Sequence, residues 1–452
     1  MNSIAKFFTL YWIIYFPTCI AFYDYPGFTY VDEVMTVILI AYTFLKKGHW
    51  ATNSESWHEY YAFLGILAFY IVYSIQFGAN VSDSVWYDLI QQIRPFSIIY
   101  CTWILNPQFT EKQKKWMLWS MILTLGAFIY TNPTIGTAHN APVGQLAICT
   151  AMTYYLYTEK TKKNLYWTIV IATVGLISMK FKYYGEWGVF VALLLFMKEK
   201  MDLGSSKATM RIAILAIIAI ILGWERFDHY FVSGFNNEEY ARPMMFKTAF
   251  KILLDYFPLG SGMGTFATNA SVVYYSPLYQ KYGLDHVWGL GHGGGFICDA
   301  FYPTLAQFGI VGIILFIIFW KRRLRRINEI EDIGYYMVGL MSCFCLAIEQ
   351  TADSSWLSGK GMGFCMLIGL CMNANFNQNE NGNEYLNENQ NENENDEGNE
   401  NQNEYLNENQ NENQNDEGNE NENDYKLHEL NELNELEEVS GDNEILETNY
   451  NL

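Results

Sequence analysis

The chain has 452 residues, of which half are hydrophobic and 17% are aromatic, and its formal net charge is −20. From Met372 onward the chain contains 24 Asp and Glu residues and a single Lys, whereas the preceding segment carries 27 basic and 24 acidic residues. This division excludes a packed core in residues 373–452, because so polar a segment cannot offset the entropy of ordering it. We also expect no nucleic-acid partner.

Before the tail, apolar runs of about 16–21 residues recur, long enough to cross a hydrocarbon core of about 30 Å as helices. Tyr and Trp crowd the ends of these runs, as in the aromatic belts of membrane proteins. We therefore predict an all-α polytopic membrane protein in residues 1–372, with about twelve transmembrane helices. The expected spans lie at 7–22, 28–45, 60–77, 94–106, 116–131, 141–157, 165–180, 186–198, 210–224, 302–320, 334–350 and 361–372.

The distribution of Lys and Arg predicts the orientation of these spans. With the N-terminus in the cytoplasm, the inner segments hold 18 basic residues, including the run KRRLRR at 321–326, and the outer segments hold nine. This bias follows the positive-inside rule. It places both termini in the cytoplasm and the long polar segment 225–301 outside it, as one large periplasmic loop.

Isolated basic residues occur in the earlier outer connections. Arg94 precedes an apolar run, and Lys180 and Lys182 lie in SMKFKYYGEWG at the outer end of a span. Each of these cations suits either a phosphate ligand or an anchor that reaches the lipid head groups. His139 begins another span in TIGTAHNAPVGQ, where a structural role is the commoner one.

The first half of the large loop predicts an amphipathic helix. If Pro243 opens it, then Arg242, Phe246 and Phe250 repeat at helical spacing, and Lys247 and Lys251 form the adjacent stripe. Such a helix suits the outer membrane surface, with its aromatic side toward the lipid and its cations near the head groups.

A glycine-rich turn, PLGSGMGTF at 258–266, follows this helix. Closely spaced glycines allow backbone N–H groups to approach an anion, although the sequence matches no established phosphate-binding loop. The second half of the loop then brings His286, His292 and Asp299 up to the next span.

Cations beside His and carboxylates at the outer leaflet favour one chemistry, in which a diphosphate leaves a sugar and an acceptor hydroxyl attacks. Preorganised Arg and Lys stabilise the departing charge without a metal. A His with a pKa near neutrality suits the general base. The loop lacks a DxD pair and an HExxH arrangement, so we expect no metal and no cofactor.

At these residues the chain resembles the O-antigen polymerase and ligase superfamily of bacterial inner-membrane proteins. The resemblance lies in the layout of spans around one large periplasmic loop, and in an Arg upstream of PLGSGMGTF, a His late in the loop and the span-opening string LAQFGIVGI at 305–313. Two departures are SMKFK, where the family often has a Ser-x-Ser-Arg-like segment, and Gly rather than Asn after His292.

The resemblance implies a polymerase of undecaprenyl diphosphate-linked oligosaccharide units at the periplasmic face of the inner membrane. It implies that Arg242 and Arg94 bind the diphosphate, assisted by Lys180, Lys182 and Lys247. His292 is then the leading base, with His286 or Asp299 as substitutes. A chain-length regulator and a flippase are the expected protein partners.

Three alternatives remain at this stage. The closest is a ligase that transfers finished glycan to a lipid A core. A polysaccharide-unit flippase or other exporter would show internal pseudo-symmetry and charges inside its spans, and neither stands out in the sequence. A metal-dependent glycosyltransferase would need acidic residues in the first outer loop, where only Asp24 occurs.

The tail contains a tandem repeat, in which residues 383–402 recur at 403–422 with two changes. We expect the tail to be disordered.

Overall fold

The computed structural model describes residues 3–374, apart from 23–26, 29, 51–53, 132–140, 198 and most of 201–238. The tail beyond residue 374 and His139 therefore lie outside the described residues, as does most of the ninth expected span. The described residues form helices and no strands. This confirms the all-α prediction for that part of the chain.

In chain order the helices are α1 (Ser3–Tyr15), the π-helical η1 (Phe16–Ala21), α2 (Val31–Trp50), α3 (Ser54–Phe77), α4 (Ser82–Leu105), α5 (Glu111–Thr131), α6 (Ala141–Tyr157), α7 (Lys162–Val174), η2 (Gly175–Ser178), α8 (Phe181–Phe196), α11 (Ala241–Asp255), α12 (Asn269–Val273), α13 (Pro277–Lys281), η4 (Tyr302–Phe308), α14 (Gly309–Asn328), α15 (Ile333–Ala352), η5 (Ser355–Leu357), η6 (Gly359–Gly361) and α16 (Met362–Cys371).

Four helical stretches in the described part are long and apolar enough to cross a membrane. They are Ser3–Ala21, Ser54–Phe77, Tyr302–Asn328 and Ile333–Ala352. The chain therefore has the character of a membrane protein. The count of about twelve spans stays a prediction, because helices such as the ten-residue α16 are too short to cross about 30 Å on their own.

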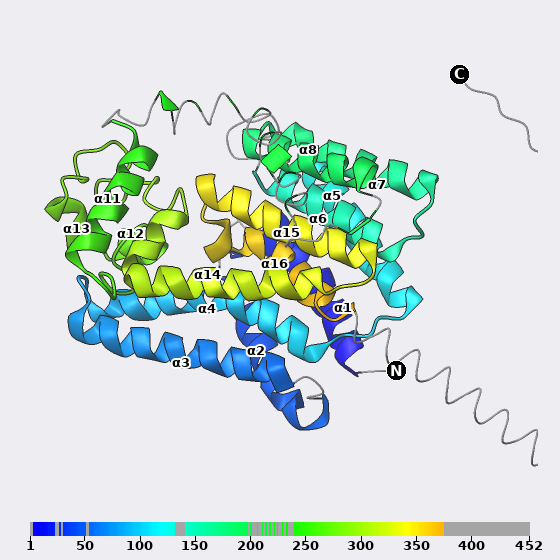
Figure 1. The fold of residues 1–452 in the computed structure, drawn as a ribbon, viewed down its shortest axis with the longest axis horizontal. Coiled ribbons are helices and arrows are strands. Elements are labelled where there is room, and N and C mark those ends of the chain that lie inside the picture. The colour runs from blue at the N-terminus through cyan, green and yellow to red at the C-terminus, as the bar shows by residue number, and fades with distance from the viewer. Residues whose placement is uncertain are drawn as a thin grey trace, which may run out of the picture. The chain divides into compact units, whose positions relative to one another are not determined.

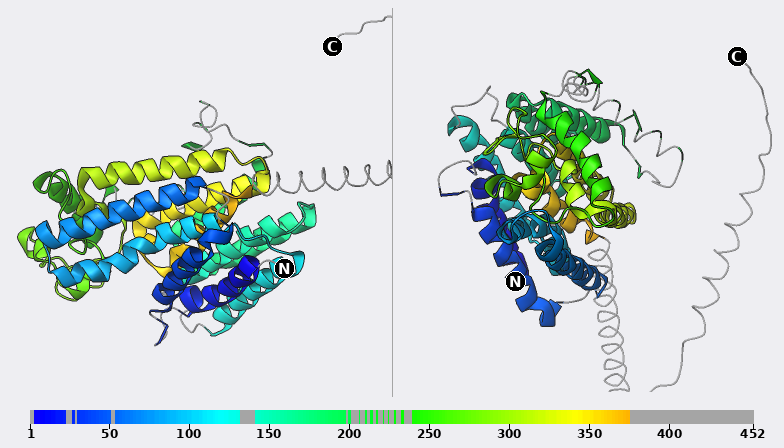
Figure 2. Two further views of the ribbon diagram at one scale, coloured as in Figure 1. Left: turned by 90° about the horizontal axis from the view of Figure 1, so that it is seen from below. Right: turned by 90° about the vertical axis from the view of Figure 1, so that its left-hand side faces the viewer.

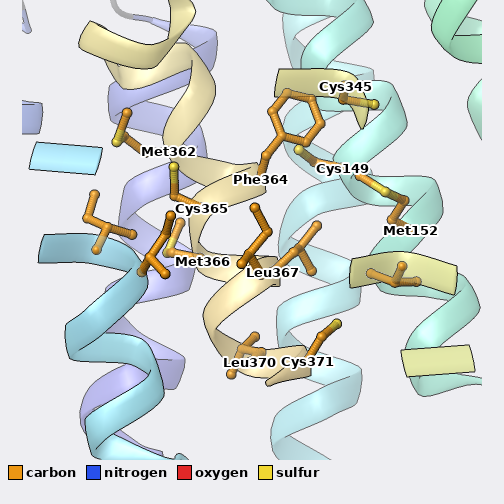
Figure 3. Close-up of a cluster of buried hydrophobic side chains, with 14 of the residues drawn as sticks. Cys149, Met152, Cys345, Met362, Phe364, Cys365, Met366, Leu367, Leu370 and Cys371 are labelled. Atoms are coloured by element: carbon orange, nitrogen blue, oxygen red, sulfur yellow. The ribbon is translucent and has the colours of Figure 1, made fainter. Parts of the chain in front are cut away.

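The core of the bundle surrounds α16, whose every residue is buried. This helix packs against α4 and α15, and Figure 3 shows buried sulfur-containing side chains around it, among them Cys149 of α6, Cys345 of α15 and Cys365 of α16 itself. Gly369 allows the closest approach to α4, because a Cβ there would lie 2.7 Å from the Cβ of Thr102. A side chain at residue 369 would push the two helices apart.

Residues 239–301 form a unit with its own small core, here called the loop unit. Its buried side chains come from α11, α13 and the turns between them, and include Met245, Ile252, Leu278 and Ile297. The loop unit lies at the common end of α3, α4 and α14, which run side by side (Figures 1 and 2). The long polar segment predicted from the sequence is thus folded where the structure describes it.

The basic run at the far end of α14 is anchored on α3 and α4. Arg323 is 1% exposed and pairs with the Glu59 carboxylate. Its guanidinium lies 5.1 Å from the ring centre of Tyr100 and 4.8 Å from that of Trp103. Cation–π contacts of this kind stabilise a buried guanidinium, so this end of the bundle is held by charge as well as by packing.

Candidate functional site

Arg242 and Asp299, two of the predicted site residues, form an ion pair within the loop unit. Arg242 stands in the first turn of α11, where the following Pro243 suits a helix start. Its Nη2 donates to Asp299 Oδ2 and, at 3.3 Å, to the carbonyl oxygen of Ala352 at the end of α15. Arg242 is only 8% exposed. Because it donates to both Asp299 of the loop unit and Ala352 of α15, it joins the loop unit to the bundle.

Lys182 forms a second ionic group directly beside this junction. Its ammonium donates to Glu349 and, at 3.1 Å, to Asp353 Oδ2. Ser355 Oγ also donates to Glu349, at 2.8 Å, and Gln145 Nε2 donates to Ser355 Oγ at 3.0 Å. The Glu349 carboxylate is therefore held by both a cation and a hydroxyl, as a buried charge requires.

The two groups make up one ionic cluster, defined as Lys182, Arg242, Asp299, Glu349 and Asp353. Burial raises the pKa of Asp299, and the Arg242 guanidinium only partly offsets this rise. Burial would also raise the pKa of Asp353, but the charges of Lys182 and Lys360 hold it at about 2. The pKa values of the two carboxyl groups are therefore shifted in opposite directions, that of Asp353 downward by its neighbouring lysines and that of Asp299 upward by burial.

Lys180 belongs to the surroundings of the cluster. It precedes α8 and is half-buried. Its pKa is lowered, chiefly by burial and next by the neighbouring charge of Lys182. Two of the predicted diphosphate ligands, Lys180 and Lys182, therefore lie near Arg242 and Asp299, and the structure brings together four of the eight predicted site residues.

Arg94 lies in a different environment from the one expected. It is 1% exposed on α4, and its guanidinium pairs with Asp32 at 2.5 Å and Glu33 at 2.7 Å in the first turn of α2. It also donates to the carbonyl oxygen of Leu357 at 3.1 Å. The alternative of a head-group anchor is wrong, since the side chain is buried among protein partners rather than reaching out to lipid.

Neither predicted histidine lies in the ionic cluster. The His292 ring packs against Tyr275, with ring centres 4.8 Å apart. The His286 side chain is 86% exposed, with Asp285 3.7 Å away. Lys247, also among the predicted ligands, is half-buried on α11. The carboxylates of the cluster are thus better placed than either histidine to act beside Arg242.

The glycine-rich turn does donate to an acidic group, but that group is the side chain of Asp88 in the same protein. Gly260, Gly262 and Gly264 have positive φ values of 84°, 93° and 70°, which only glycine adopts readily. The N–H of Gly264 donates to the Asp88 carboxylate at 3.0 Å, and that of Gly262 donates to the carbonyl oxygen of Gln307 at 3.0 Å. The turn therefore fastens the loop unit to α4 and η4, and its structural role explains the glycines.

Sequence reasoning missed Glu349, Asp353 and Lys360 as site residues. All three lie in the stretch EQTADSSWLSGKG between two apolar runs. Acidic and basic side chains lie close together near the expected outer end of a span, and this pattern could have indicated a functional site. Glu349 and Asp353 pair with Lys182 of α8, however, and nothing in the local sequence pattern connects these residues.

The site shows no arrangement suited to a metal. Among the described residues, no three His, Cys, Asp or Glu side chains are grouped to hold a metal ion.

Two apolar hollows lie elsewhere in the described part. The hollow of about 450 Å³ is lined by α3 and Leu259, and the hollow of about 580 Å³ is lined by α5, α6 and α7. No residue of the ionic cluster lines either hollow. The candidate site is therefore the cluster itself, at the junction of the loop unit and the bundle.

No protein-family model and no curated protein matches this sequence. Function must therefore be inferred from the chain's own residues.

Proposed function

We propose that the protein polymerises oligosaccharide units carried on a polyprenyl diphosphate, at the periplasmic face of a bacterial inner membrane. One observation carries the proposal. Arg242 and Lys182, each paired with carboxylates, meet where the polar loop unit joins a bundle with membrane-spanning character. In this proposal the cations for a diphosphate and the carboxylate for an acceptor hydroxyl would lie at the height of the lipid head groups.

In this proposal Arg242 binds the diphosphate of the donor, assisted by Lys180 and Lys182. The acceptor hydroxyl attacks the anomeric carbon, and the bond between that carbon and the diphosphate oxygen breaks. The electron pair leaves with the diphosphate, whose growing charge the cations stabilise. The hydroxyl proton passes to a carboxylate, and the new glycosidic bond forms with inversion.

We assign the base role to Asp299 rather than to His292. Asp299 is hydrogen-bonded to Arg242, its side chain is 34% exposed, and its pKa is raised by burial. A base close to the leaving group and accessible to an acceptor meets the geometric requirement for general base catalysis. His292 packs on Tyr275 instead, and Asp353 is held as an anion too firmly to take a proton.

The rest of the biological setting is part of the same proposal. Both termini would lie in the cytoplasm, and the protein would work with a flippase that delivers the lipid-linked units and with a chain-length regulator. About twelve spans would surround the donor. A ligase that uses the same donor would need the same cations, so the choice between the two enzymes depends on the acceptor.

One observation favours an exporter as the second candidate. Glu186 is 0% exposed and Glu349 is 1% exposed, and both lie within reach of the Lys182 charge. Buried ionisable residues near membrane-spanning helices are typical of ion-coupled transport. Lys182 and Glu349 already compensate each other, however, which suits a fixed structural charge as well as a moving one.

The test is a gel of surface glycan from a deletion strain beside its parent. A polymerase predicts loss of the long ladder while a single repeat unit remains on its acceptor. Ladder retained on the lipid carrier but absent from lipid A would mean a ligase instead. Single units trapped at the cytoplasmic side would mean an exporter, and either result overturns the proposal.

Complementation of the deletion strain assigns the residues. Arg242→Ala is expected to abolish the ladder at unchanged membrane abundance, and Asp299→Asn is expected to do the same, since the amide keeps the shape but cannot take a proton. Lys163→Met, an exposed position at the start of α7, is the matched control and should restore the ladder. Loss of the protein together with the polymer would instead indicate a role in folding.

A further inference from the structure

One face of α11 presents large apolar side chains to the surroundings. Phe250 and Leu254 of α11, and Phe257 two residues beyond its end, are 66%, 78% and 70% exposed, and Phe250 and Leu254 lie on one helix face at i, i+4 spacing. The opposite side of α11, with Met245 and Ile252, is buried in the core of the loop unit. These three exposed residues, here called the α11 apolar face, therefore do not belong to the described core of the loop unit.

The α11 apolar face continues onto α3. Phe69, Val72 and Phe77 of α3 are 51%, 62% and 71% exposed, and together with Leu259 they line the apolar hollow of about 450 Å³. Leu259 follows Phe257 by two residues. The Tyr73 hydroxyl of α3 donates to the carbonyl oxygen of Gly260 at 2.8 Å, so the end of α11 is fixed against the end of α3.

The direction of α11 suits a membrane surface. In Figure 1 and in the right-hand view of Figure 2, α11 runs across the direction of α3 and α14. Both α3 and the stretch that contains α14 are long and apolar enough to cross a membrane. If they cross it, α11 lies in the plane of the bilayer at their end, which is the position of an interfacial amphipathic helix.

The lysines on and near α11 fit a bilayer with anionic lipids, and the exposed Asp255 at the end of the helix accepts a hydrogen bond from the Tyr282 hydroxyl at 2.6 Å. Lys251 is exposed on the same helix, and the Lys281 ammonium lies 4.7 Å from the ring centre of Tyr256. Basic residues beside an inserted apolar face are attracted by anionic head groups. Apolar side chains flanked by lysines are therefore the pattern of a lipid contact rather than of a site for a polar ligand.

We propose that the α11 apolar face, with the exposed end of α3, inserts into the phospholipid leaflet nearest the loop unit. This contact is independent of the proposed reaction. It also differs from the stripe expected from the sequence, because Arg242 points into the ionic cluster while Phe250 points out. Anchored in this way, α11 holds its first turn, and Arg242 with it, over the end of α15.

The test uses single cysteines placed on the full chain and labelled with the fluorophore NBD. The background carries Cys298→Ser, because the other seven cysteines are buried. Leu254→Cys and Phe257→Cys are the reporters, and His286→Cys, at a side chain that is 86% exposed, is the matched control. Each labelled protein is placed in nanodiscs of phosphatidylethanolamine and phosphatidylglycerol, with and without doxyl-labelled acyl chains.

The expected result is a blue-shifted emission and at least a two-fold quenching by doxyl lipid at residues 254 and 257, with little change at residue 286. Equal and weak quenching at all three positions would overturn the proposal, because the face would then lie in water. A blue shift that persists without quenching by doxyl lipid would also overturn it, since another protein surface would then cover the face.

Discussion

Replacement of Lys182 by Met removes the cation that compensates Glu349, and the structure gives the expected size of the effect. The Glu349 side chain is 2% exposed and cannot regain water without opening the bundle. Breaking a buried pair by removing one partner costs about 3–5 kcal/mol. Asp353, which is 21% exposed, can be rehydrated and contributes less, so we expect about 3–5 kcal/mol in total.

A second substitution separates charge from packing. In the Lys182→Met/Glu349→Gln variant, the neutral amide still accepts the hydrogen bond from Ser355 Oγ. The uncompensated charge is gone, so the double variant should recover most of the stability that the single variant loses. The exposed Lys163→Met substitution is the control and should stay within about 0.5 kcal/mol of the parent.

The assay is unfolding in detergent micelles, followed by the reaction of buried cysteines with a thiol dye. Cys149 and Cys345 are 0% exposed and become reactive only when the bundle opens. A Lys182→Met variant that is as stable as the parent would refute the reasoning. So would a double variant as unstable as the single one, because the loss would then come from packing and not from an unpaired carboxylate.

The other predictions concern separate features. The pKa of Asp353 is held at about 2, below its unfolded value, so the stability it contributes is present above about pH 4 and should be lost as the pH falls toward 2 in the same unfolding assay. Gly260→Ala should prevent accumulation in membranes, since its Cβ would lie 2.3 Å from the N atom of Gly309. His292→Ala should keep near-normal glycan chain length on the gel. Deletion of residues 377–452 should leave the ladder unchanged, and altered chain length would show that the tail acts.

The sequence was most informative where the structure depends on local pattern. Pro243 correctly predicted the start of a helix at residues 241–255, and the glycines at 260, 262 and 264 correctly predicted a tight backbone turn. Both follow from backbone preferences that act over a few residues. The sequence also placed Arg242 and Asp299 in the same loop, although it gave no reason to pair them.

Partners distant in the chain were beyond this kind of reasoning. Arg94 pairs with Asp32, 62 positions earlier, and Lys182 pairs with Glu349, 167 positions later. No periodicity joins such residues, because a charge pair across a bundle depends on how the helices pack. Arg94 therefore resembled an outward-facing cation in the sequence, and Glu349 and Asp353 were not assigned to the site.

Compensation of the cations constrains how a diphosphate can bind. Arg242 and Lys182 already face carboxylates, so an incoming diphosphate must displace at least one carboxylate or meet its repulsion. Among the acidic residues of the ionic cluster, Asp299 is the most exposed, at 34%, and its pKa is raised. Exchange of Asp299 for phosphate on Arg242 would both bind the donor and release a carboxylate beside the anomeric carbon. In the proposed enzyme, donor binding would thus itself free the base, which would explain why the carboxylate proposed as the base is paired with the proposed diphosphate ligand.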